Sequence, residues 1–475
     1  MKYPPVQNSR AGDSSEHQGE WLDVVSPVDG IPLTRVPLSL PAELNNAVEA
    51  AANAVVGWSN RTLRQRAEFF FRYRSLLEQQ RTELAQLVHE ENGKTVEEGL
   101  AEVDKAIEVT EFACSLPSFA TGEVLQVSPD VECRIEHAPL GVIACITPFN
   151  FPVMVPHWTI PIAIVLGNTM ILKPSEKVPL SAQRTAELLR QSGLPGGVFN
   201  VVHGDARVVD AICDHPRIAA ISFVGSTPVA KKVYARGASN MKRVLAMGGA
   251  KNHLVVLPDA NPEQTAVNVI ASMAGCAGQR CMAASSLIAV GNVDRVIDCI
   301  CREARRLIPG QHIGAVISHA AKARIERSIG EAEQAGARIL VDGRGTNVAG
   351  SENGSYVGPT VLDHVTADMQ IAQEEIFGPV LAILRADTLE EALRIENESR
   401  FGNAAAIYTQ DGAAASKFIH RASSGMIGVN VGVPIPREPF GFGGWNDSRF
   451  GVGDITGKGS LAFWTQSKKI TTRWT

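Results

Sequence analysis

The sequence predicts an α/β protein with two doubly wound α/β domains and one small additional β element. Two series of short apolar segments alternating with helical segments support this prediction, one starting at residue 141 and the other near residue 243. Strands that alternate with helices form parallel sheets covered on both faces. The small β element is predicted from two segments of alternating polarity, within 120–139 and 455–475. A chain of 475 residues is also too long for one ordinary domain.

The elements before residue 140 are a tail, a helical region and a hairpin. Residues 1–20 are polar, rich in Pro, Ser and Gly, and without the apolar centre of a secretory signal, so we expect a flexible tail. Residues 41–114 carry apolar side chains at helical spacing. The segment GEVLQVSPDVECRIEHAPLG alternates on either side of SPD, which predicts two paired strands. The first α/β domain is therefore expected to comprise residues 21–119 and 140–246.

The two strand–helix series complete the predicted architecture. GVIACI, NTMILKPS, GGVFNVVHG and RIAAISFVGS are the strands expected in the first domain, and HLVVLPDA, SSLIAVG, ARILVDG, NAAAIYTQ and GMIGVNVG those in a second domain of residues 247–454. Ligands of such sheets bind at the carboxyl ends of the strands. The last segment, GSLAFWTQSKKITTRW, is predicted to be a strand that pairs with the early hairpin or with another subunit.

Composition excludes several classes of function. The net charge of -5 leaves no broad basic surface for nucleic acid, and no apolar run is long enough to cross a bilayer. The eight cysteines form no regular framework, and no Cys/His pairs stand at zinc spacing, so no metal site is expected. A reducing cytoplasm is the simplest location for such a chain.

The stretch AGCAGQRCMAAS (274–285) holds two cysteines, of which only Cys281 sits beside a cation, Arg280. Free cysteine is among the most buried residue types, so the stretch alone leaves open whether Cys281 is a nucleophile or part of the core. Asn150, in ITPFNFP after the first parallel strand, is either a turn residue or an amide donor for a developing oxyanion.

Two further strand ends carry candidate cofactor contacts. Lys173 and Glu176, in LKPSEKVPL, form either a solvated ion pair or a clamp on the ribose of a dinucleotide. A carboxylate there repels a 2′-phosphate and favours NAD over NADP, although Lys177 acts against this preference. Gly225 and Ser226 lie at a strand-to-helix turn of the kind that suits a pyrophosphate.

Taken together, PFNFP, KPSE, FVGST, GQRC and EEIFGP occur in an order that resembles the NAD(P)-dependent aldehyde dehydrogenase superfamily, from about residue 20 to the end. The resemblance implies that Cys281 is the nucleophile, that Asn150 is the oxyanion donor and that Cys276 is a packing residue. It also implies a homodimer or homotetramer assembled through segments 120–139 and 455–475. The cofactor contacts that it implies are Thr147, Phe149, Lys173, Glu176, Lys177, Gly225, Ser226, Gly248, Glu375 and Phe377.

One departure from that family concerns removal of the acyl group. Hydrolytic members carry a glutamate in ELGGK that activates water, whereas this chain has LAMGGAKNH, with Met247 or Ala246 at the glutamate position. A general base contributes ~10²–10⁴-fold to such a step, and a thiol acceptor needs less activation than water. GGAKNH, GQRCMA and FWTQSKKITTRW resemble the coenzyme A-acylating methylmalonate-semialdehyde dehydrogenase branch, which implies NAD as cofactor and coenzyme A as co-substrate.

A second departure concerns the substrate. In that branch an arginine on the helix before ACS joins the arginine before the nucleophile to bind a substrate carboxylate. Here Arg280 is present, but Lys105 stands at the other position and lacks the planar fork of arginine. A malonate or methylmalonate semialdehyde is expected, with a shorter, longer or sulfonated substrate as an alternative. A hydrolytic aldehyde dehydrogenase and a catalytically silent binding protein are the other readings of the chain.

Overall fold

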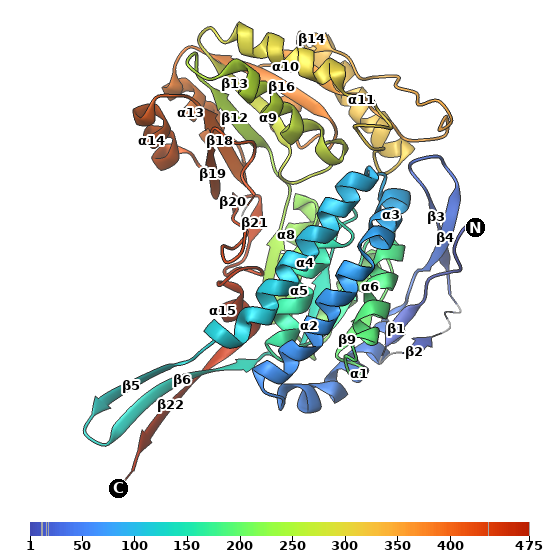
Figure 1. Cartoon of the computed structure of the whole chain (residues 1–475), viewed down its shortest axis with the longest axis vertical. Helices are drawn as coiled ribbons and strands as arrows, with labels where there is room; N and C mark the ends of the chain where they lie inside the picture. Colours follow the sequence, from blue (N-terminus) through green and yellow to red (C-terminus); the bar gives the residue numbers. More distant parts are fainter. Residues whose placement is uncertain (11–12, 16, 18, 436, 475) are drawn as a thin grey trace.

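The computed structural model describes residues 1–10, 13–15, 17, 19–435 and 437–474. The chain forms two lobes, one above the other in the view of Figure 1, and an arm that projects from the lower lobe and ends at the carboxyl terminus. Each lobe contains one large sheet, and the arm is a separate sheet of three strands. The arm combines strands from two distant parts of the chain, within residues 123–139 and 465–473.

The sheet of the first lobe has eight strands in the order β2-β1-β9-β8-β7-β10-β11-β21. Its five central strands run parallel. They are β7 (Val142–Ile146), β8 (Thr169–Lys173), β9 (Phe199–Val201), β10 (Ile218–Val224) and β11 (Arg243–Met247). The outer strands are β1 (Asn8–Arg10), β2 (Asp13–Ser15) and β21 (Arg449–Phe450).

Helices cover both faces of this sheet. One face packs on α1 (Pro41–Ser59), α7 (Ala206–Asp214) and α8 (Thr227–Ser239). The other packs on α2 (Leu63–Gln79), α3 (Arg81–Asn92), α4 (Val96–Phe119), α5 (Met154–Val165) and α6 (Pro179–Gln191). Along β7, Ala144 packs toward the first set, and Ile143 and Cys145 pack toward the second. This alternation explains why the strand is apolar throughout.

The sheet of the second lobe has the order β14-β15-β16-β13-β12-β18-β19, and only β14 is antiparallel to its neighbour. The strands are β12 (Asn252–Val256), β13 (Ala284–Val290), β14 (Arg338–Val341), β15 (Thr360–Asp363), β16 (Val380–Ala386), β18 (Ala404–Tyr408) and β19 (Met426–Val429). Its helices are α9 (Pro262–Ala274), α10 (Asp294–Arg306), α11 (His319–Gln334), α12 (Gln370–Gln373), α13 (Leu389–Asn397) and α14 (Gly412–Arg421). Helices α9 and α10 cover one face and α13 and α14 the other, so this lobe is also doubly wound.

The arm joins the predicted hairpin to the end of the chain. It consists of β5 (Glu123–Ser128), β6 (Val131–Pro139) and β22 (Thr465–Arg473), and β22 pairs with β6 in antiparallel register along its whole length. A short helix, α15 (Ser460–Trp464), precedes β22, so the first part of the predicted final strand is helical. Two small pairs complete the fold, β3 (Trp21–Val25) with β4 (Pro32–Pro37) and β17 (Phe401–Gly402) with β20 (Trp445–Asn446).

The prediction of a flexible tail at residues 1–20 is wrong for the described part of that segment. Strand β1 pairs with β9, and the Asn8 side chain accepts a hydrogen bond from the His203 backbone at 2.9 Å. The side chains of Val6 and Asn8 are buried. The segment is polar because it lies at a sheet edge, where its backbone supplies the pairing and few side chains are covered. Residues 11, 12, 16 and 18 of the predicted tail lie outside the described residues.

The predicted limits of the second domain also need one correction. Residues 449–450 fall inside the range 247–454, yet they form β21 and pair with β11 of the first sheet. A strand of two residues is too short to show alternation of polar and apolar side chains.

Among the described residues, no helix is both long and apolar enough to span a membrane, and no cluster of three or more His, Cys, Asp or Glu side chains could hold a metal ion.

Candidate active site

A tight turn precedes Cys281. Residues Gly275–Gly278 form one 3₁₀ turn at the end of α9, and Cys276, Ala277 and Gly278 all have positive φ, of 55°, 51° and 69°. A Cβ atom at Gly278 would lie 2.1 Å from the carbonyl oxygen of Gly378, so no larger residue fits there. Such conformations are costly for residues other than glycine and cluster at functional sites. The turn ends the helix and directs the chain back toward the first lobe.

The backbone of Cys281 is held from two places in the second lobe. Asn252, the first residue of β12, and Asn403, the residue before β18, donate side-chain hydrogen bonds of 2.7 and 2.9 Å to the Cys281 carbonyl oxygen. Arg280 donates from Nη2 to two carbonyl oxygens of α9 at 2.7 and 2.8 Å. The loop that carries the candidate nucleophile is therefore fixed on both sides of the thiol.

Exposure distinguishes the two cysteines better than acidity does. Burial raises the pKa of the Cys281 thiol to about 12 and that of Cys276 to about 11. At Cys281 the Glu375 carboxylate raises the pKa further, and Arg280 lowers it. Cys281 is partly exposed, whereas Cys276 is buried and its backbone N–H donates to Glu98. Cys281 is thus the more accessible of the two thiols.

Asn150 reaches the nucleophile loop from the first lobe. Its Nδ2 donates a 3.0 Å hydrogen bond to the carbonyl oxygen of Gln279, two residues before Cys281. A side-chain amide carries two N–H donors, so one remains for a substrate oxyanion. The Gln279 side chain is itself buried and accepts a 2.9 Å hydrogen bond from the Ile317 backbone. The structure therefore brings Asn150 and Cys281 together across the two lobes.

The carboxyl ends of β7 and β8 bring together the predicted adenosine-side contacts. Lys173 Nζ lies 3.1 Å from Glu176 Oε2, with the lysine buried and the glutamate partly exposed. Thr147 follows β7 and donates its backbone N–H to the Lys173 carbonyl oxygen at 3.1 Å. Lys177 Nζ lies 5.3 Å from the ring centroid of Phe149, in a cation–π contact. These five side chains lie together, while their contacts to a cofactor stay predictions.

The predicted pyrophosphate contacts lie at the start of α8. Ser226 is the N-cap residue, is exposed, and makes no side-chain capping hydrogen bond. A Cβ atom at Gly225 would lie 2.6 Å from the Phe223 ring, and one at Gly248 would lie 2.7 Å from the Asp447 carbonyl oxygen. Packing within the protein therefore already requires both glycines. The exposed helix N-terminus remains available to an anion.

Glu375 and Phe377 come from the second lobe. Glu375 accepts a 3.1 Å hydrogen bond from the Ala250 backbone, and burial raises the pKa of its carboxyl to about 7. Phe377 has a positive φ of 54°, and its ring meets that of Phe149 edge to face, with centroids 5.8 Å apart. The Phe149–Phe377 contact joins the first lobe to the second beside the thiol site.

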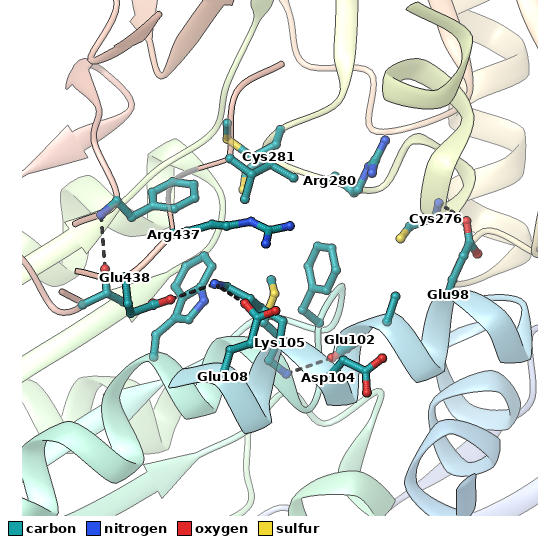
Figure 2. Close-up of a pocket in the computed structure, with 18 of the residues that line it drawn as sticks. Glu98, Glu102, Asp104, Lys105, Glu108, Cys276, Arg280, Cys281, Arg437 and Glu438 are labelled. Carbon is teal, nitrogen blue, oxygen red and sulfur yellow. Dashed lines mark hydrogen bonds and ion pairs between the residues drawn. The ribbon is translucent and has the colours of Figure 1, made fainter. Parts of the chain in front are cut away.

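A cavity of about 480 Å³ opens beside Cys281 and is shown in Figure 2. Apolar side chains supply much of its lining, among them Phe151, Met154, Trp158, Met282, Phe440 and Phe442. Arg280 and Lys105, the two predicted substrate contacts, are among its lining residues. The Lys105 ammonium, however, is paired with Glu438 at 2.8 Å and with Glu108 at 3.0 Å. Lys105 therefore does not present a free positive charge to the cavity.

A family model for the aldehyde dehydrogenase family matches residues 14–470. This chain belongs to the aldehyde dehydrogenase family. A malonate-semialdehyde dehydrogenase 2 of Oceanobacillus iheyensis is 44% identical, with 96% of this chain and 97% of that protein covered. A malonate-semialdehyde dehydrogenase of Pseudomonas aeruginosa is 42% identical, with 98% and 95% covered. A solved Sinorhizobium meliloti structure, assigned as a methylmalonate-semialdehyde dehydrogenase and complexed with NAD, is 40% identical, covers 100% of this chain and 99% of its own, and has a TM-score of 0.98.

These matches confirm two predictions. The chain has the predicted fold class, and it is an enzyme of the aldehyde dehydrogenase family. The family motifs do not include the groups that hold Asn150 in place. Lys94, between α3 and α4, is buried and ion-paired with Glu102, and it donates to the Asn150 carbonyl oxygen. Glu102 accepts hydrogen bonds from the backbones of Val153 and Met154 at 2.7 and 3.0 Å. One feature of the sequence does indicate this role. Glu102 lies four residues before Ala106, on the apolar face of α4, where a carboxylate needs a buried partner.

In this family member the end of β11 carries no carboxylate. Ala246 and Met247 are both buried, and they face opposite sides of the sheet. Met247 belongs to the same apolar cluster against which Cys281 packs, whereas Ala246 packs beneath α8. No Asp or Glu occurs between Asp214 and Asp259. This strand therefore offers no base for a water molecule attacking a thioester.

Proposed function

We propose that this enzyme oxidises a small acid semialdehyde of the malonate or methylmalonate semialdehyde class with NAD and transfers the acyl group to coenzyme A. The neighbours of Cys281 carry the proposal: an amide donor on one side, a cavity with arginine side chains on the other, and no carboxylate at the end of β11. The curated relatives support the same substrate class, since both are malonate-semialdehyde dehydrogenases.

The chemistry proceeds in two halves through the Cys281 sulfur. Loss of the thiol proton to solvent gives a thiolate, which adds to the aldehyde carbon and forms a C–S bond while the C=O π electrons move onto the oxygen. Asn150 Nδ2 and the Cys281 backbone N–H stabilise the oxyanion that results. Lys173, Glu176 and Glu375 would hold NAD, which would supply the hydride acceptor, so that loss of the hydride from that carbon would leave a thioester on Cys281. The coenzyme A thiol then attacks the thioester carbonyl, and the Cys281 thiol is released.

The direct experiment measures NADH formation from malonate semialdehyde and from methylmalonate semialdehyde, each with and without coenzyme A. We expect rapid turnover only with coenzyme A and an acyl-CoA product identified by mass. A free acid formed at the same rate without coenzyme A would favour the hydrolytic alternative. Glu375 is the group to test in that case, because its charge acts on Cys281 and its carboxyl pKa is raised to about 7.

NAD is expected to be preferred over NADP by about 10-fold or more in kcat/KM, because like charges brought together cost several kcal/mol. Glu176 pairs with Lys173 where the adenosine ribose would bind, and a 2′-phosphate carries a charge of about -2. Lys177 Nζ lies over the Phe149 ring and keeps its charge, so it opposes this preference only in part. Glu176→Gln should reduce the preference, whereas Lys177→Gln, which removes a positive charge at the same strand end, should not. An NADP preference in the unmodified enzyme would contradict the assignment of Glu176.

The arm is proposed to bind a second copy of the chain, giving a homodimer or homotetramer. All six residues of β5 are exposed, and they include Val124 and Leu125, with 67% and 66% of their surface accessible. An exposed apolar edge strand invites pairing and is ordinarily covered. We expect Val124→Lys/Leu125→Lys to lower the mass measured by light scattering, while Gln126→Lys leaves it unchanged. A monomeric unmodified enzyme would contradict this proposal.

Location in a reducing cytoplasm is proposed from the state of the cysteines. All eight are free in the structure, including the nucleophile. Extracellular chains more often pair their cysteines, and an exposed catalytic thiol is oxidised most readily outside a reducing compartment. Cell fractionation followed by detection of the enzyme tests this location.

A further inference from the structure

Arg437 extends into the cavity beside Cys281 from the loop that follows β19. Figure 2 shows its guanidinium in the space bordered by Cys281, Arg280 and Lys105. Among the residues that the structure describes, no side chain or carbonyl forms a hydrogen bond or an ion pair with this guanidinium. An arginine that faces a substrate cavity without a counter-ion is a candidate for binding an anion.

The acidic side chains that line the cavity already have partners. Lys105 pairs with Glu108 and Glu438, Arg81 pairs with Asp104, Lys94 pairs with Glu102, and Glu98 accepts from the backbones of Thr95 and Cys276. Arg437 is therefore not held by the protein's own carboxylates. Arg280 also has capacity left, because α9 occupies its Nη2 and, among the described residues, its Nη1 has no hydrogen-bond partner.

We infer that Arg437, together with Arg280, binds the carboxylate of the substrate, and that Lys105 is a positioning residue that acts through Glu438. The inference rests on the proposed function, since it assumes an acid semialdehyde, and it names the residue that selects that class. Arg437 and Glu438 are neighbours in the chain. The Lys105–Glu438 ion pair is mostly shielded, with 17% and 13% of the two side chains exposed, so it ties the loop to α4 next to the guanidinium.

Arginine suits this role better than the lysine on α4 does. Its planar fork can donate two parallel hydrogen bonds to one carboxylate, whereas an ammonium acts as a point charge. In malonate semialdehyde a single carbon separates the carboxylate from the aldehyde. The cation that recognises it must then lie in the same small cavity as the Cys281 sulfur, as Arg437 and Arg280 do.

The test compares an acid and a neutral aldehyde of similar size. Arg437→Gln should lower kcat/KM for malonate semialdehyde by about 10- to 100-fold, mainly through a higher KM, because the charged hydrogen bonds to the substrate carboxylate are lost. With propanal, which lacks the carboxylate, the same variant should stay within about 3-fold of the unmodified enzyme. Arg437→Lys should restore part of the loss. An unchanged ratio of the two kcat/KM values in Arg437→Gln overturns the inference.

A double-mutant cycle separates positioning by Lys105 from direct binding. Lys105→Met should lower the ratio of kcat/KM for malonate semialdehyde to kcat/KM for propanal less than Arg437→Gln does. In the double variant this ratio should be no lower than in Arg437→Gln alone. Losses that multiply in the double variant would show that Lys105 binds substrate itself. If the unmodified enzyme shows no preference for the acid over propanal, the proposed substrate class fails. If the unmodified enzyme prefers the acid and the Arg437→Gln variant shows the same preference, the substrate class stands and only the proposed role of Arg437 fails.

Discussion

Cys281→Ala is expected to abolish NADH formation, with a loss of about 10⁴-fold or more, because removing the group that bonds to the substrate removes the reaction path itself. The alanine lacks only the sulfur, and the hydrogen bonds from Asn252 and Asn403 go to the backbone carbonyl of residue 281. The loop should therefore keep its shape. Steady-state NADH absorbance measures activity, and tryptophan fluorescence quenching by NAD measures cofactor binding, which should be retained.

Cys276→Ala is the matched control for this prediction. Cys276 is buried, and the interaction that holds it, with Glu98, uses its backbone N–H. We expect this variant to retain most of its activity, with at most a moderate loss of stability from the deleted sulfur. An inactive Cys276→Ala together with an active Cys281→Ala would show that the nucleophile has been assigned to the wrong cysteine.

The second large effect is expected in deacylation. Without coenzyme A, rapid mixing of enzyme, NAD and semialdehyde should give a burst of NADH approaching one per active site, followed by slow turnover. The reason is that Ala246 and Met247 supply no base for water, a contribution of ~10²–10⁴-fold. Adding coenzyme A should restore fast steady turnover. Fast turnover to free acid without coenzyme A would falsify acyl transfer as the physiological step.

The structure selects the residue with which to test the missing base. Met247 faces the large apolar cluster that extends through both lobes and against which Cys281 packs, while Ala246 packs on the opposite face of the sheet beneath α8. Met247→Glu should therefore raise the slow phase without coenzyme A, and Ala246→Glu should not. Both introduce a buried carboxylate, so thermal unfolding of both variants should be followed to separate loss of fold from change of rate.

Periodicity predicted most of the central strands of both lobes, but not β15 and β16 of the second sheet, nor the helices α5 and α11. Strands such as β7 and β8 are buried on both faces and read as continuous apolar runs, and β22 reads as alternation. Strands β1 and β21 could not be predicted in this way. They are two or three residues long and contribute backbone pairing at a sheet edge rather than a buried face. Local sequence carries no signal for such pairing.

Candidate site residues that lie in family motifs could be predicted from the sequence. Supporting residues whose interaction partners are distant in the sequence could not. Cys281 and Asn150 follow from GQRC and PFNFP. The Lys94–Glu102 pair lies about fifty residues before the turn that it supports, and the Lys105–Glu438 pair joins residues 333 positions apart. Charged residues at such separations resemble ordinary surface residues until the fold brings them together. Arg437 was missed for the same reason.

The hydrogen bond from Asn150 to the Gln279 carbonyl oxygen spans the two lobes, and each end is anchored in a different one. Lys94 and Glu102 fix the asparagine to the first lobe, and Asn252 and Asn403 fix the cysteine to the second. A small shift of one lobe against the other would separate Asn150, the proposed oxyanion donor, from Cys281, the proposed nucleophile, while both cores stay intact. Inactivation by mild denaturant should accordingly precede the loss of helical circular dichroism, which makes catalytic rate a sensitive gauge of lobe alignment.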